Sequence, residues 1–493
     1  MPNPPAHSAR IALSSFKRGK KVDLHKMSFY ARAIGLFQSR SAKARSIIDI
    51  VTIIRYPRLA LILAALAIAG QLEAQIDLPA PESETEGQTE TTPSPEVTPE
   101  APVQIRPDEG SPVAGTEVNA PQFDIGRHLH ASGSLNGGYD DNVNLTPAGS
   151  PSWYANPTAN IRYLFGSARL AMDLLAGGGI NYYFDHPGSR DYDPIVYLNL
   201  SVAYKVAPRL TLNFSTSSAY ESQPELGTAL SSINRLGNYF RSQDHLSAHY
   251  KLSPRWSSVT GYELSALEYE SSAGQNRLQH AFSEQLRYLW LPTTTVSGSY
   301  RISLNESQGA QGESTTQSLL AGLEQSFSPR FKAGLQTGVQ FRSGNGGGKT
   351  SPFVETSLHY ELAARTYILW TNRYSIEESD LQNAAGRETF RTNLKLNYAI
   401  TARISASLAL IYSHGDNGTS NQISSGSLGG SSTETTFDIT PSIRYAITQR
   451  CSVNAGYRYT KVDRGSGAAA LEPLQSVTSY TRNRYFAGIT ISF

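Results

Sequence analysis

The sequence has little of what a disulfide-stapled domain or a helical membrane protein needs. It holds one cysteine, Cys451, and three methionines, and only 39% of its 493 residues are hydrophobic. A single cysteine excludes an intramolecular disulfide and a cysteine-based zinc site. The apolar run at residues 59–70, LALILAALAIAG, is too short to cross a bilayer as a helix. Membrane insertion through helices is therefore not predicted.

Charge is distributed unevenly, although the formal net charge is only +2. Residues 1–74 hold 12 Lys or Arg against 3 Asp or Glu, whereas residues 75–122 hold 1 against 10. The basic segment with the apolar run at 59–70, ending in LEA before Gln75, predicts an N-terminal extension and a signal peptide cleaved after Ala74. Because the basic excess lies in this leader, no nucleic-acid partner is predicted.

The remainder divides into two parts of different composition. Residues 75–122 are rich in Pro, Glu and Thr and have no apolar periodicity, which predicts a disordered acidic linker. From 123 to 493, strand-like runs are joined by short connections such as KLSPRW (251–256) and longer polar ones such as 415–433. Short and long connections alternate, as the periplasmic turns and extracellular loops of outer-membrane barrels do, so the short ones are predicted to be periplasmic and the long ones extracellular.

Within the runs, apolar and polar residues alternate, as in a strand with one face toward lipid. Val354, Leu358 and Tyr360, for example, oppose Glu355 and Ser357. Counting the runs predicts an all-β fold, a transmembrane antiparallel up-and-down barrel of about 18 strands (16 to 18). Tyrosines cluster toward the short connections, as an interfacial aromatic girdle would: Tyr204, Tyr250, Tyr300, Tyr360, Tyr398 and Tyr445.

The last run, TRNRYFAGITISF (481–493), alternates and ends on Phe493. It resembles the C-terminal strand that the barrel-assembly machinery recognises in bacterial outer-membrane proteins, so this machinery is an expected partner. Outer-membrane lipid and lipopolysaccharide are expected surroundings, and a homotrimer is one assembly such a barrel allows. The predicted location is the cell outer membrane.

A barrel of this size can leave an aqueous channel, so the candidate functional residues are charged side chains on the inner wall. Arg458, Arg484 and Asp438 lie at similar heights above their connections, which predicts a cluster of two guanidinium groups and a carboxylate. It is either a constriction that orients anionic or sugar-like solutes or a salt-bridged wall. Further pore-lining candidates have the same parity: Glu263, Glu355, Arg391 and Lys395.

Two connections invite other hypotheses. The segment 222–236 is long enough to fold inward and narrow the pore, or to remain on the surface. Asp140, Asp141, Asn142 and Asn144 could offer oxygen ligands to Ca²⁺, but they lack EF-hand spacing, and Asp and Asn are also ordinary turn residues. No cofactor is predicted.

The stretch GSLNGGYDDNVNLTP (133–147), followed by barrel hairpins to the terminal Phe, resembles the second β-barrel porin family of Gram-negative bacteria. The resemblance covers about residues 125–493, but only this motif is specific. It implies an outer-membrane barrel with porin activity, and some family members are associated with exopolysaccharide export. It implies no catalytic residues.

The sequence analysis therefore predicts a channel for passive diffusion of small hydrophilic solutes, with export-associated, structural and adhesive barrels as alternatives. The Ser- and Gly-rich segment 417–434 could contact surface polysaccharide. An outer-membrane hydrolase is a weaker alternative, because His280 and His414 belong to no recognisable catalytic motif. The chain is accordingly not expected to be an enzyme.

Overall fold

The computed structural model describes residues 126–187, 191–222, 237–270, 276–308, 312–344, 348–363, 365–378, 384–419, 432–465 and 479–493. The predicted leader and linker (1–122) lie outside these residues, as do nearly all of 222–236 and most of 417–434. No helix in the described part of the chain is long and apolar enough to cross a membrane.

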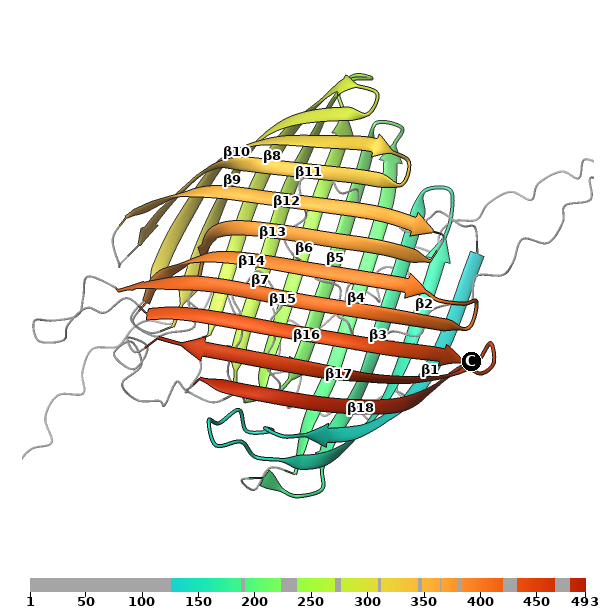
Figure 1. Ribbon diagram of the computed structural model, residues 1–493. Coiled ribbons are helices and arrows are strands. Elements are labelled where there is room, and N and C mark those ends of the chain that lie inside the picture. The colour runs from blue at the N-terminus through green and yellow to red at the C-terminus, as the bar shows by residue number, and fades with distance from the viewer. Residues whose placement is uncertain are drawn as a thin grey trace, which may run out of the picture. The chain divides into compact units, whose positions relative to one another are not determined.

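The described residues form one closed antiparallel sheet of 18 strands (Figure 1). Each strand pairs with its neighbours in sequence, and β1 also pairs with β18. The predicted fold class is therefore confirmed. The strand bounds are β1 Gly126–Asp140, β2 Ser152–Gly166, β3 Leu170–Tyr183, β4 Tyr192–Ala207, β5 Leu210–Glu221, β6 Tyr239–Lys251, β7 Trp256–Tyr269, β8 Arg277–Leu291, β9 Thr294–Ser307, β10 Glu313–Ser328, β11 Phe331–Gly344, β12 Lys349–Ala363, β13 Thr366–Glu377, β14 Ala384–Ala399, β15 Ile404–Thr419, β16 Ser432–Ala446, β17 Cys451–Arg464 and β18 Tyr480–Ser492.

Closure of the sheet depends on the pairing of its first and last strands. Their register runs from Ser132 opposite Ser492 to Asp140 opposite Arg484. Beyond it, the Phe493 N–H donates to the Ala131 carbonyl at 2.7 Å, so pairing continues to the end of the chain. Because lipid cannot satisfy backbone N–H and C=O groups, closing the edge removes a cost that an open sheet would carry in a membrane.

Several of the recurrent short connections are tight turns that use a Ser or Thr hydroxyl. In four of them this hydroxyl accepts a hydrogen bond from the backbone N–H three residues later, at 2.9–3.1 Å. Such side-chain acceptors favour turns over continued strand. The four pairs, hydroxyl first, are Ser167 and Leu170, Ser253 and Trp256, Thr401 and Ile404, and Thr448 and Cys451.

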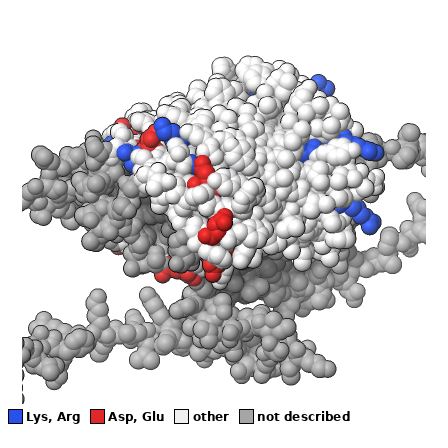
Figure 2. All heavy atoms as spheres, turned by 60° about the horizontal axis from the view of Figure 1, so that its bottom comes forward, with Lys and Arg blue, Asp and Glu red and all other residues white. Residues whose placement is uncertain are grey.

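The outer face of the barrel carries large apolar side chains. Trp153 and Leu319 are 61% and 65% exposed, and all six tyrosines expected in the aromatic girdle are exposed. In Figure 2 a broad band of the visible face is uncharged, with acidic residues along its left side and Lys and Arg toward its right. A water-soluble protein rarely exposes so large an apolar surface. A closed β-barrel with such an apolar belt is typical of outer-membrane proteins. This chain is therefore located in the outer membrane.

Candidate functional site: the inner wall of the barrel

The inner wall is formed by alternate residues of all 18 strands, opposite in parity to the exposed apolar belt. The register places the seven predicted pore-lining residues on this inward parity, each beside inward residues of neighbouring strands. Their role in conduction stays a prediction. These residues are Glu263, Glu355, Arg391, Lys395, Asp438, Arg458 and Arg484.

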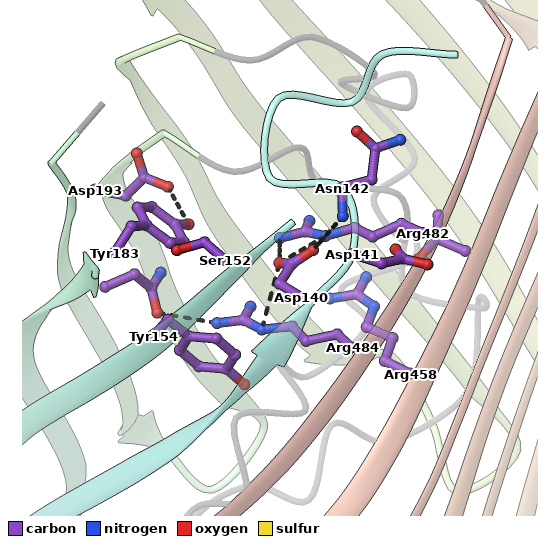
Figure 3. A network of polar contacts seen from close by, with 12 residues as sticks. Asp140, Asp141, Asn142, Ser152, Tyr154, Tyr183, Asp193, Arg458, Arg482 and Arg484 are labelled. Carbon is purple, nitrogen blue, oxygen red and sulfur yellow. Dashed lines mark hydrogen bonds and ion pairs between the residues drawn. The ribbon is translucent and has the colours of Figure 1, made fainter. Parts of the chain in front are cut away.

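The predicted arginine cluster is brought together by β16, β17 and β18. Arg458 lies directly opposite Arg484 in the register, and the Arg458 Nε donates to Asp438 at 2.8 Å. The Arg484 guanidinium lies over the Tyr154 ring, 4.0 Å from its centroid, and donates to the Asn181 Oδ1 at 3.1 Å. Figure 3 shows the two arginines side by side, reaching from neighbouring strands.

A further arginine in this cluster, Arg482, was not singled out from the sequence. Both oxygens of Asp140 accept hydrogen bonds from its Nε at 3.0 Å, and the two side chains are almost fully buried. The Arg484 Nε is 3.9 Å from the same carboxylate. Parity could have identified Arg482, because it lies two residues before Arg484 on the same face of β18. Three carboxylates lie in the same network as these three arginines: Asp140, Asp438 and Asp193, the last of which accepts a hydrogen bond from the Tyr183 hydroxyl and lies opposite Asn181 in the register.

A second charged network extends over β13, β14, β16 and β17. Glu377 accepts from Arg391 at 3.0 Å and from Arg387 at 3.4 Å. Arg387 also donates to Glu434 at 2.7 Å, and Glu434 accepts from Arg464 at 2.9 Å. These side chains are at most 8% exposed. The predicted residue Arg391 is thus part of a continuous ladder of alternating charges.

The remaining predicted carboxylates are also paired. Glu263 accepts from Arg301 at 2.9 Å, and the Glu355 carboxylate lies 3.7 Å from Arg373. A long-range pair between strands cannot be found from one sequence, because parity says which face a residue occupies but not which distant residue reaches it. The inner wall is therefore a patterned, largely charge-compensated surface.

Exposure of the inner wall changes along the strands. On β12, Ser351, Phe353 and Glu355 are buried, whereas Ser357 is half-buried and Glu361, near the short turn, is exposed. On β14 likewise, inward residues from Arg387 to Arg391 are buried, whereas Lys395 and Asn397 are half-buried. In these strands the wall is more accessible toward the short-turn end.

The acidic stretch considered as a Ca²⁺ site is used differently. Asp140 binds Arg482, and the Asp141 carboxylate accepts from the Asn483 backbone N–H at 2.7 Å and its amide at 2.6 Å. Among the described residues, no group of three or more His, Cys, Asp or Glu side chains is arranged to hold a metal ion. The carboxylate oxygens serve contacts between the first and last strands instead.

The two histidines considered for a hydrolase lie on outward-facing positions. The His280 Nδ1 lies 2.9 Å from the Tyr262 hydroxyl, and the His414 Nδ1 lies 2.9 Å from the Thr435 hydroxyl. Both histidines therefore contact outer-face side chains of adjacent strands rather than the charged inner wall.

No protein-family model matches the chain, and no curated protein does. Solved structures similar to it include OccAB4 from Acinetobacter baumannii, with 11% identity, 76% of this chain and 100% of that chain covered, and a TM-score of 0.40. The outer membrane protein OpdK from Pseudomonas aeruginosa has 10% identity, with 74% and 99% covered and a TM-score of 0.39. The siderophore receptor PirA from Acinetobacter baumannii has 10% identity, with 75% and 81% covered and a TM-score of 0.39. The assignment of the fold rests on the strand pairing of this chain itself.

Proposed function

We propose that this protein is an outer-membrane channel through which small hydrophilic solutes diffuse passively. The observation that carries the proposal is the contrast between an apolar outer face and an inner wall of charged side chains on an 18-stranded barrel. A barrel of this strand number has room for a water-filled passage, and a polar wall is what such a passage requires. We further propose that the chain is a member of the second β-barrel porin family, a proposal supported by the GYDDN motif at 138–142.

The seven inward charged residues are proposed to line this passage, with the Arg458 and Arg484 pair as its most specific feature. Opposed guanidinium groups raise the local concentration of anions, because a low-dielectric wall weakens screening of their charge. We therefore expect anions to be the preferred ions at this guanidinium pair.

The test is single-channel recording in planar bilayers with protein purified from outer membranes. Discrete conductance steps and a reversal potential of anionic sign across a KCl gradient are expected. Arg458→Ala and Arg484→Ala should each shift the reversal potential toward cation preference. Arg330→Ala, which removes an exposed arginine from a short turn, should not.

A folded barrel that gives no steps in any variant would overturn the channel proposal. It would favour the export-associated or structural role instead. Steps whose selectivity is the same in all four proteins would keep the channel but remove the arginine pair as its filter.

A further inference from the structure

The first long connection, residues 141–151, packs against inward-facing side chains. Its Val143 side chain is fully buried and packs with Tyr154, Tyr183 and Phe486. These three residues come from β2, β3 and β18, and the register gives them the inward parity of Asp140 and Arg484. Val143 therefore lies inside the barrel.

A second apolar contact carries the segment further along the wall. Leu145 is 8% exposed and packs with Val462 of β17 and Tyr480 of β18. In the register Val462 lies opposite Tyr480, and both have the inward parity of Arg458. The segment thus reaches from β1 across β18 to β17 within the lumen.

Three consecutive polar residues fasten the base of this segment to β18. Asp140 holds Arg482, Asp141 holds Asn483, and the Asn142 amide donates to the Thr481 carbonyl at 2.8 Å. Figure 3 shows Asp140, Asp141 and Asn142 gathered around Arg482 where β1 ends. The sequence motif considered for Ca²⁺ therefore joins the end of the first strand, β1, to the last strand, β18.

The backbone of the segment is also specified. Val143 donates to the Ser150 carbonyl at 2.9 Å, and Ser150 donates to the Asp141 carbonyl at 3.1 Å. Leu145 has a left-handed backbone with φ 53°, which costs a non-glycine residue about 1–2 kcal/mol. Such a conformation persists only when its surroundings hold it, and here the apolar contacts of the Leu145 side chain do so.

We propose that this inward-folded segment, 141–151, narrows the channel and limits the size of the solutes that pass. The inference rests on the proposed channel function. It assigns to the first long connection the constricting role that the sequence analysis considered for 222–236, of which residues 223–236 lie outside the described part of the chain. The segment lies beside Arg458 and Arg484, so solutes would be sieved and meet the guanidinium pair at one level of the barrel.

One measurement tests the position of the segment without any conduction. In a Cys451→Ser background, Leu145→Cys with Val462→Cys should be joined by a short bifunctional thiol reagent in the folded protein. The pair Leu145→Cys with Leu319→Cys is the control, because Leu319 lies on the outer face of β10. Crosslinking in the control but not in the first pair would overturn the inward placement.

A second measurement tests the constriction itself. Val143→Asn with Leu145→Asn should release the segment from its apolar contacts while keeping the Asp140–Arg482 pair, and Asn tolerates the left-handed backbone at 145. Single-channel conductance and the size limit for sugars in liposome swelling should both increase. Val206→Asn with Leu252→Asn, which changes exposed apolar residues near the short-turn end, should match the unmodified protein.

The outcomes separate the two proposals. Steps that are the same size in the released and unmodified proteins would overturn the constriction and leave the channel standing. Steps that occur only in the released protein would support the constriction in its strongest form, a closed pore. Folded proteins that never conduct, released or not, would overturn the channel function and the constriction with it, even where crosslinking places the segment in the lumen.

Discussion

Gly138 of β1 lies against the backbone carbonyl of Tyr485 of β18, so closely that a Cβ at this position would overlap it. The close approach occurs in the stretch where the first and last strands pair. It explains a glycine two residues before Asp140, where any side chain would separate the strands that close the barrel.

Gly138→Ala should therefore weaken closure of the barrel. Forcing a methyl group into this contact is expected to cost about 1–3 kcal/mol of unfolding free energy. Gly133→Ala on the same strand is the control. A Cβ at position 133 would lie 3.9 Å from the Thr158 carbonyl oxygen, which is an ordinary contact distance. Urea unfolding followed by heat-modifiable gel mobility measures both. Equal midpoints for the two variants would contradict the close-approach argument.

Asp140 and Arg482 should behave as a coupled pair. Asp140→Asn leaves a buried arginine without its carboxylate, and Arg482→Met leaves a buried carboxylate without its arginine. Each single change is expected to cost about 3–5 kcal/mol, whereas the double variant should recover a large part of that loss. A double-mutant cycle on unfolding free energy measures the coupling. If the costs of the two single changes simply add in the double variant, the pair does not stabilise the pairing of β1 with β18.

Glu377 should be the most sensitive position of the second charged network, because it is 2% exposed and binds both Arg387 and Arg391. Glu377→Gln would leave two buried guanidinium groups near each other with one carboxylate fewer. The free energy of unfolding should therefore fall by about 3 kcal/mol. Asp463→Asn provides the comparison, since the Asp463–Lys461 pair is exposed. The same unfolding assay should show no change for the exposed pair.

A charged side chain introduced on the lipid-facing side of a strand should destabilise the barrel, whereas one introduced on the inner wall should be tolerated. Leu358 and Ser357 are neighbours on β12, with Leu358 on the lipid-facing parity and Ser357 on the inner wall, beside Gly334. Leu358→Arg is expected to destabilise the barrel in lipid by about 2–4 kcal/mol, because the charge would enter the bilayer. Ser357→Arg should be tolerated. Folding yield into lipid vesicles and urea midpoints measure both, and a reversed order would contradict the assigned faces.

Several features of this protein could be predicted from local pattern. Alternation along runs such as 353–361 identifies the lipid-facing parity, and because that parity is periodic it also identifies which charged residues face inward. The regular succession of short and long connections predicts the strand number. Arg458 and Arg484 could be paired because equal spacing from adjacent connections implies equal height.

Contacts between residues far apart in the chain could not be predicted in this way. From the sequence, the stretch at 140–142 suggested a turn or a cation-binding site. Nothing local indicates that its side chains instead bind Arg482, Asn483 and the Thr481 carbonyl, about 340 residues away. The partners of Glu377 are likewise set by side-chain reach across the wall.

The sequence by itself determined the strands, their faces and their order, since these follow from a two-residue period and from a regular succession of short and long connections that is typical of an up-and-down barrel. Only the tertiary structure decided the register of β1 on β18, the inward path of residues 141–151 and the ion pairs of the wall. Those depend on closure, which brings the two ends of the barrel sequence together and so creates contacts that no local pattern specifies.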